Sequence, residues 1–291
     1  MQFDFVGIGA PRCGTTWISK QLSCHPEICF SLPKESYFFS NKNKYSLGIE
    51  WYREQYYASH RKGQYCGEFT PTYYISQEAK QRILSLNPTV KFIVSVRNPI
   101  DRAVSHYQLL KLRDGISCTF SEAFASNHDL FKYGLYYFYL SHFFSDIHPH
   151  QYHVINYADI VNDPKTVIRN LCTFLHIDHH PITKDTEQLQ QREYSIQQAQ
   201  HYYSVWLDTW LRKRTLIGMR HKTIASIMHS SSVRRVADVI SKLNTRGESE
   251  LLTKVPDVTI DASLYEKLSA YYQDDAEKFA AMFGFNPFDA K

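Results

Sequence analysis

The chain has 291 residues, a length that fits one large domain or two small ones. Hydrophobic residues make up 43% and charged residues 21%, so a sizeable core can be buried, while a net charge of +4 is too small to indicate nucleic-acid binding by itself. None of the six cysteines forms a C-x-x-C pair, which argues against a zinc site, and because nothing else indicates secretion we expect the thiols to be reduced. The first residues lack the features of a signal peptide and no apolar run is long enough to span a bilayer, so we expect a cytoplasmic protein.

Short apolar runs alternate with segments of helical periodicity through the first part of the chain. We expect strands at residues 3–8, 28–30, 91–96 and 153–157, and helices at residues 15–22, 76–86, 100–112, 136–147 and 163–175. The alternation predicts a single α/β domain over residues 1–291, with a P-loop-like parallel sheet of about four to five strands and helices on both faces.

The last third of the sequence has a different character. Residues 207–246 are rich in Lys and Arg, and we expect a helical insertion at about residues 200–250. Surface helices with solvated basic faces, a wall for an anionic substrate, and a helix in peripheral contact with a membrane are the three interpretations of this stretch. Ser263 and Glu266 have the spacing of a capping box and Gly284 is placed to end a helix, which predicts a helix over residues 263–283.

The first strand leads into a phosphate-type loop, Gly9-Ala10-Pro11-Arg12-Cys13-Gly14-Thr15-Thr16. Thr15 stands where a nucleotide triphosphatase carries the P-loop lysine, which argues against nucleotide hydrolysis. The backbone amides at the start of the following helix can still face an anion, and Arg12 can supply positive charge. An ordinary glycine-containing turn between a strand and a helix is the alternative.

A second strand-loop-helix unit carries Arg97 at the end of its strand and Ser105 in the helix that follows. Both side chains can point to one ligand at the carboxyl edge of the sheet, and an arginine with a hydroxyl suits a second phosphate. Between the two units, Lys34 and Glu35 lie in a polar turn that precedes two phenylalanines. By themselves, Arg97 is more typical of a strand cap, Ser105 of a surface helix, and Lys34 and Glu35 of a surface ion pair.

Taken together and in this order, the segments resemble PAPS-dependent sulfotransferases (PAPS is 3′-phosphoadenosine-5′-phosphosulfate). The loop from Pro11 to Trp17 resembles the 5′-phosphosulfate loop of that family, and the segment from Arg97 to Tyr107 resembles its 3′-phosphate site. The K-E-x-x-F-F segment that begins at Lys34 is similar to one in heparan sulfate-type and related bacterial sulfotransferases. The likeness covers residues 4–110 well and is poor over residues 185–260.

The resemblance implies a role for each matching residue. The donor PAPS and its product PAP would be bound by the loop, by an aromatic near the adenine, by the second motif and by a carboxy-terminal loop: Pro11, Arg12, Cys13, Gly14, Thr15, Thr16, Trp17, Arg97, Ser105, Arg246 and Gly247. Glu35 would be the general base, with His106 as the alternative base, and Lys34 and Arg12 would neutralise charge. Glu68, Thr72 and Tyr73 would contact the acceptor.

The sequence therefore predicts a sulfotransferase that acts on a hydroxyl or amine of a small-molecule or carbohydrate acceptor by in-line transfer, with no metal required. A P-loop kinase of a small molecule is the first alternative. The second is a non-catalytic module that binds a polyanion or a membrane surface through residues 207–246.

Overall fold

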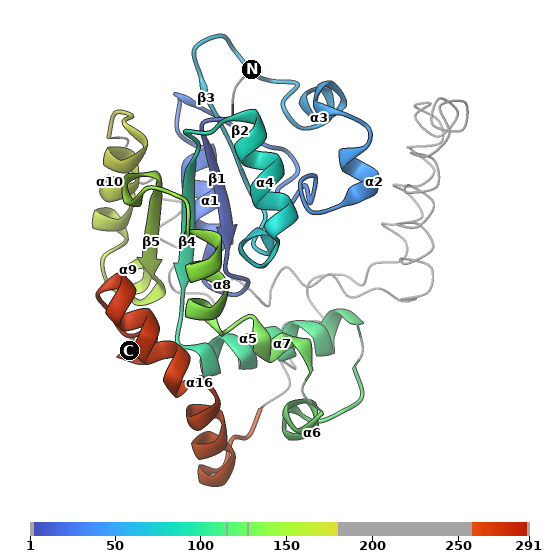
Figure 1. Ribbon diagram of the computed structural model, residues 1–291, viewed down its shortest axis with the longest axis vertical. Helices are drawn as coiled ribbons and strands as arrows, with labels where there is room; N and C mark the ends of the chain where they lie inside the picture. Colours follow the sequence, from blue (N-terminus) through green and yellow to red (C-terminus); the bar gives the residue numbers. More distant parts are fainter. Residues whose placement is uncertain (1–2, 115, 127, 180–257, 290–291) are drawn as a thin grey trace, which may run out of the picture.

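The computed structural model describes residues 3–114, 116–126, 128–179 and 258–289. Its centre is a parallel sheet of five strands in the order β2-β3-β1-β4-β5 (Figure 1). The strands are β1 (Phe5–Gly9), β2 (Ile28–Phe30), β3 (Tyr65–Phe69), β4 (Lys91–Val96) and β5 (Tyr152–Asn156). The predicted α/β fold with four to five parallel strands is confirmed.

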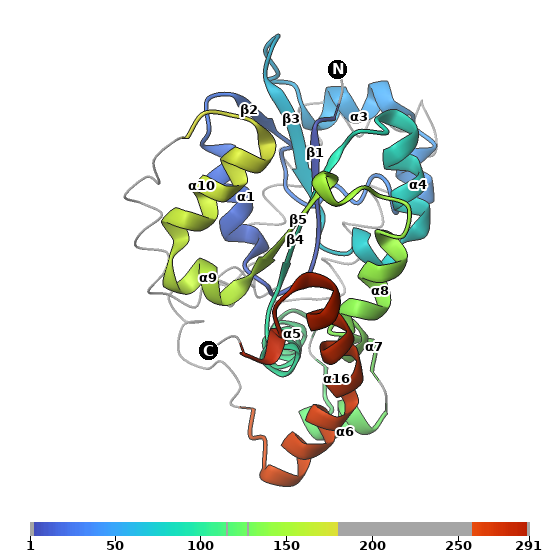
Figure 2. The same cartoon turned by 60° about the vertical axis from the view of Figure 1, so that its left-hand side comes forward.

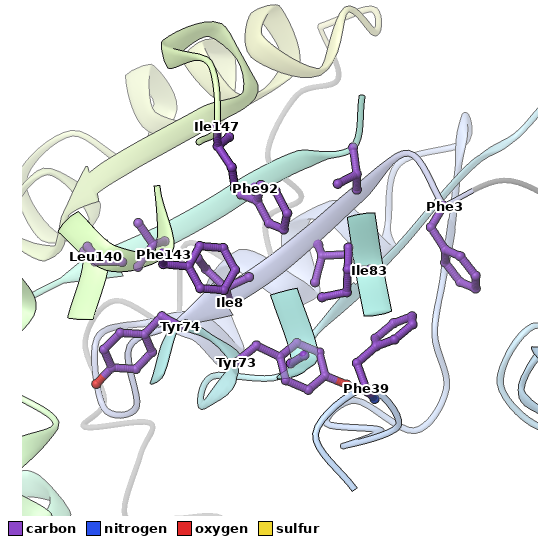
Figure 3. Packing of buried hydrophobic residues seen from close by; sticks show 14 of the residues in the cluster. Phe3, Ile8, Phe39, Tyr73, Tyr74, Ile83, Phe92, Leu140, Phe143 and Ile147 are labelled. Atoms are coloured by element: carbon purple, nitrogen blue, oxygen red, sulfur yellow. Dashed lines mark hydrogen bonds between the residues drawn. The ribbon is translucent and has the colours of Figure 1, made fainter. Parts of the chain in front are cut away.

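Helices cover both faces of the sheet (Figure 2). One face carries α1 (Thr15–Ser23), α9 (Tyr157–Asn162) and α10 (Pro164–Leu175). The other carries α3 (Ile49–Tyr56), α4 (Gln77–Leu86) and α8 (Tyr136–Phe143). Each face has its own apolar cluster, and Figure 3 shows part of the second one, where Ile83, Leu140 and Phe143 pack over Ile8 and Phe92. Burial of these side chains is the main term that stabilises the layers.

A third apolar cluster lies beyond the carboxyl ends of the strands. It joins α5 (Pro99–Asp114), α6 (Phe120–Ala125), α7 (Asp129–Lys132) and the long carboxy-terminal helix α16 (Ala262–Phe283). The short elements α2 (Lys42–Tyr45), η1 (Tyr73–Ile75), η2 (Pro149–Gln151) and η4 (Pro287–Asp289) complete the described residues. None of the helices in these residues combines the length and apolar character that a bilayer crossing requires.

Side-chain caps explain where several helices begin. Ser76 and Asp163 accept hydrogen bonds from the amides of Ala79 and Thr166, at the starts predicted for α4 and α10. The predicted capping box at Ser263 and Glu266 is wrong. The N-cap is Asp261, which accepts from the Leu264 amide over 2.7 Å and so starts the helix earlier.

The other elements differ from the sequence prediction in some places and agree with it in others. The helix predicted over residues 136–147 ends at Phe143, and Gly284 ends α16 in the left-handed conformation as predicted. The strand β3 was not predicted. The insertion expected at about residues 200–250, with its basic stretch 207–246, lies outside the described residues.

Candidate active site

The loop between β1 and α1 is fastened to the neighbouring strand β4. The Ala10 amide donates to the Ser95 carbonyl over 2.8 Å, and the Ser95 hydroxyl donates to the Cys13 carbonyl over 2.6 Å. Gly14 is the N-cap of α1 in the left-handed conformation, with φ +78°, and has no side chain to cap the helix. The first amides of α1 are thus left for an anion, as in other phosphate loops.

Arg12 connects this loop to the second motif. Its Nε donates to the Ser105 hydroxyl on α5 over 3.1 Å, so the two predicted phosphate-binding segments meet. Its Nη2 is buried and has no hydrogen-bond partner among the described residues. Burial, with the nearby charge of Arg97, lowers the pKa of Arg12 to about 10. A buried donor without a partner and a guanidinium whose charge is disfavoured by its surroundings would both be stabilised by an anionic ligand, so the site around Arg12 fits one.

Arg97 follows the end of β4, as predicted. Its carbonyl accepts from the Tyr136 hydroxyl over 2.8 Å, which fixes the backbone. The guanidinium carbon lies 4.7 Å from the centre of the Tyr157 ring, and in the described part of the chain the guanidinium has no hydrogen bond or ion pair. Arg97 is therefore a second cation beside Arg12 whose donors are available to a ligand.

Lys34 joins the loop to the predicted base. Its Nζ donates to the Thr15 and Thr16 hydroxyls, each over 3.4 Å, and to Glu35 Oε1 over 2.9 Å. Its surroundings lower the pKa of Lys34, first through burial, although Glu35 opposes this shift. One ammonium group thus touches both the anion-binding loop and a carboxylate.

Glu35 is held from both sides and remains accessible. The Tyr37 hydroxyl donates to Glu35 Oε2 over 2.8 Å, and the Glu35 side chain keeps 36% of its surface exposed. Glu35 and Tyr37 have φ values of +65° and +53°, a left-handed conformation that is uncommon outside glycine. Such backbone strain occurs most often at functional sites.

Several predicted residues lie elsewhere. Glu68 and Tyr73 are fully buried and hydrogen-bond within the core, so the prediction that they contact the acceptor is wrong. His106 contacts Arg102 and Tyr133, and its role as the alternative base stays a prediction.

The remaining predicted residues contribute in other ways or stay predictions. The Cys13 thiol and the Pro11 ring are buried, which leaves only their backbone to a ligand. Trp17 is 8% exposed in the apolar cluster under α1 and α10, so contact with an adenine stays a prediction, as does the role of the half-buried Thr72. Arg246 and Gly247 lie outside the described residues.

Two residues at the site were missed. Tyr157 packs against Arg97 and lies 3.1 Å from where a side chain on Gly14 would begin. Its place directly after β5, at the carboxyl edge of the sheet, is the signal that could have identified it. Tyr37 follows Glu35 closely in the sequence, but its contact with the carboxylate depends on the conformation of the turn.

Comparisons with known proteins agree with this arrangement. The sulfotransferase domain family matches residues 3–230. Heparan sulfate glucosamine 3-O-sulfotransferase 5 of Mus musculus is 36% identical over 100 residues, which cover 34% of this chain and 28% of that protein. The 3-O-sulfotransferase 3B1 of Mus musculus is 32% identical over 177 residues, covering 58% and 44%. The chain thus matches less than half the length of these curated relatives.

A solved structure has a similar fold. A sulfotransferase from Alicyclobacillus acidocaldarius superposes with a TM-score of 0.66 and 20% identity, covering 98% of this chain and 97% of that one. The family match extends over more than half of the residues, through both anion-binding motifs and the Lys34–Glu35 turn. The chain therefore belongs to the sulfotransferase domain family, a family of transferases.

Proposed function

We propose that this protein transfers a sulfuryl group from PAPS to a hydroxyl or amine of an acceptor, and that the acceptor is a carbohydrate. The observation that carries the proposal is the position of Lys34, whose ammonium contacts Thr15 and Thr16 of the anion-binding loop and also Glu35. A cation between a donor site and a carboxylate suits transfer of an anionic group to an acceptor whose proton must be removed.

The donor would be held by two groups of residues. The loop amides with Arg12, Thr15 and Thr16 would hold the phosphosulfate end. Arg97 and Ser105 would hold the 3′-phosphate, and the buried Nη2 of Arg12, without a partner among the described residues, supports an anion between the two groups. Arginine can bind phosphate oxygens through two parallel hydrogen bonds, which suits both positions.

The residues around the loop can supply the proton acceptor and the positive charges that sulfuryl transfer requires. PAPS, when bound, supplies the sulfuryl group. Glu35, exposed and fixed by Lys34 and Tyr37, would accept the proton of the acceptor hydroxyl. Lys34 and Arg12 would neutralise negative charge at the loop, and the fixed positions of these groups would limit the rearrangement that transfer requires.

The carbohydrate acceptor is supported by the curated relatives. Two of them are named as heparan sulfate glucosamine 3-O-sulfotransferases. A cytoplasmic location stays a prediction.

Calorimetric titration with PAP and with ADP tests the donor site. We expect wild-type protein to bind PAP well and ADP weakly, because only PAP carries the 3′-phosphate. Arg97→Ala should lose the preference for PAP, whereas Arg169→Ala, an exposed arginine on α10, should keep it. Equal affinity of the wild type for both nucleotides would contradict the 3′-phosphate site, and magnesium-dependent ATP turnover would favour the kinase alternative.

Transfer itself is tested with labelled PAPS and a set of acceptors. Incubation with an N-sulfated heparan oligosaccharide, a lipid head-group alcohol and a simple aryl amine separates the acceptor classes. Label in the oligosaccharide supports the proposal. Label only in one of the other acceptors would keep the sulfuryl transfer and reject the carbohydrate.

A further inference from the structure

A buried carboxylate lies behind the turn that carries the proposed base. Glu68, in β3, has none of its surface exposed. Its Oε2 accepts from the Ser36 hydroxyl over 2.5 Å and from the Tyr52 hydroxyl over 2.8 Å. A carboxylate buried in the core costs folding free energy unless it is well hydrogen-bonded, so its presence there suggests a role other than stabilising the fold.

Ser36 is the point at which the turn is fastened. Its hydroxyl donates to Glu68 and accepts from the Phe38 amide over 3.1 Å, and its carbonyl accepts from Lys44 Nζ over 2.5 Å. The residues on either side, Glu35 and Tyr37, both have left-handed backbone conformations. The fixed residue therefore lies between the two strained ones.

The strained conformation needs support from outside the turn. A non-glycine residue in the left-handed region is disfavoured and persists only where its surroundings hold it. The Glu35 amide donates to the Phe69 carbonyl over 3.2 Å, and the Tyr37 amide to the Thr70 hydroxyl over 3.4 Å. These bonds lie beside Glu68 in the sequence, so the turn is attached to the end of β3 at three successive residues.

We infer that Glu68 is a positioning residue, which acts through Ser36 to hold Glu35 in the conformation that directs its carboxylate to Lys34. This inference rests on the proposed function, in which Glu35 accepts the acceptor proton. Glu68 accepts hydrogen bonds from the Ser36 and Tyr52 hydroxyls, and of these two residues only Ser36 belongs to the turn. The effect of Glu68 is transmitted through the Ser36 hydroxyl and the backbone of the turn.

Two single-hydroxyl deletions separate positioning from simple core stability. Ser36→Ala and Tyr52→Phe each remove one donor to the same Glu68 oxygen, but only Ser36 belongs to the turn. If Glu68 only satisfies buried polar groups, the two variants should behave alike. If it positions Glu35, Ser36→Ala should lower kcat by about 10- to 100-fold, as a small misplacement of a reacting group does, while Tyr52→Phe should stay within about threefold.

The experiment measures kcat, the Kd for PAP and the melting temperature of both variants, with a crystal structure of Ser36→Ala. We expect similar melting temperatures, unchanged PAP affinity, and Glu35 outside the left-handed region in the Ser36→Ala crystal. Equal kcat for the two variants, or Glu35 unmoved in the crystal, would overturn the inference. If the wild type transfers no sulfuryl group, the proposed function fails, and the position of Glu35 in the crystal still decides whether Ser36 and Glu68 hold the turn.

Discussion

Arg12 donates a hydrogen bond from Nε to the hydroxyl of Ser105 over 3.1 Å, although the two residues are 93 positions apart in the sequence. The contact joins the loop after β1 to the helix after β4, strands that are neighbours in the sheet. In open parallel sheets, ligands bind at the carboxyl ends of the strands, where such loops converge. The two anion-binding motifs are therefore two halves of one site.

Removal of the Ser105 hydroxyl should weaken PAP binding selectively. Ser105→Ala takes away a hydrogen bond to a charged group, worth about 1.5–3 kcal/mol, and so about a 10- to 100-fold loss of PAP affinity. ADP affinity should change by less than threefold. Ser85→Ala, which removes an exposed hydroxyl on α4, is the control for calorimetry. An equal loss for PAP and ADP would mean that Ser105 does not face the 3′-phosphate.

Neutralisation of the proposed base should separate binding from turnover. Glu35→Gln keeps the size of the side chain: its amide oxygen can still accept from Lys34, and its amide nitrogen can donate to the Tyr37 hydroxyl. We expect kcat to fall by about 10²- to 10⁴-fold, the usual contribution of a general base, while the Kd for PAP stays within about twofold. His106→Asn should keep kcat within about threefold. Wild-type turnover by Glu35→Gln would exclude Glu35 as the base.

Glycine is required at position 14 for two reasons that can be tested together. Its φ is +78°, and a Cβ there would lie 2.9 Å from Ile160 Cδ1. Gly63 has a similar φ of +93° but nothing within 4 Å, so Gly63→Ala is a matched control for backbone strain. Gly63→Ala should lose about 1–2 kcal/mol of unfolding free energy from backbone strain, measured by urea titration, and Gly14→Ala should lose more, because the Ile160 side chain must also shift. Only Gly14→Ala should also lose PAP affinity, and equal affinity in the two variants would show that this loop does not contact the ligand.

The strands show how far the sequence alone can predict the fold. Lys91–Val96 is a continuous run of β-forming residues and was predicted to the residue, because its hydrophobicity fits a strand buried on both faces. Tyr65–Phe69 was missed, because Gly67 and Glu68 interrupt the apolar pattern. In the structure a Cβ on Gly67 would lie 2.1 Å from the Phe5 ring, so the aromatic ring fills the space that a side chain would take.

Site residues that belong to a motif could be predicted from the sequence. Residues whose role depends on whether they are buried in the fold could not. The glycine loop, Arg97 and Ser105 could be named from motifs that resemble those of a known family, and the structure brings Arg12 and Ser105 into contact. Glu68 was misplaced at the acceptor, because a short segment of sequence does not show that a carboxylate is covered on all sides. The left-handed turn at Glu35 also depends on bonds to β3 that only the folded chain provides.

The pH dependence of stability should reveal the cost of burying Glu68. Burial raises the pKa of Glu68 above its ordinary value of 4.5, against the opposing effect of the Ser36, Tyr52 and Tyr73 hydroxyls and of Lys44. When the pKa of a carboxyl group is higher in the folded state than in the unfolded state, the group stabilises the folded state, and this contribution is complete at pH values below the pKa of the unfolded state. The contribution is lost as the pH rises through the pKa of the folded state.

Replacement of this residue by a neutral isostere tests that sign. Glu68→Gln cannot ionise, so the difference in melting temperature between Glu68→Gln and wild type should be close to zero at about pH 4 and should grow in favour of the variant toward pH 8. Glu78→Gln, which neutralises an exposed carboxylate on α4, should show no such rise. A variant that is less stable than wild type at pH 8 but equal to it at pH 4 would mean that the hydrogen bonds to the ionised carboxylate outweigh its burial.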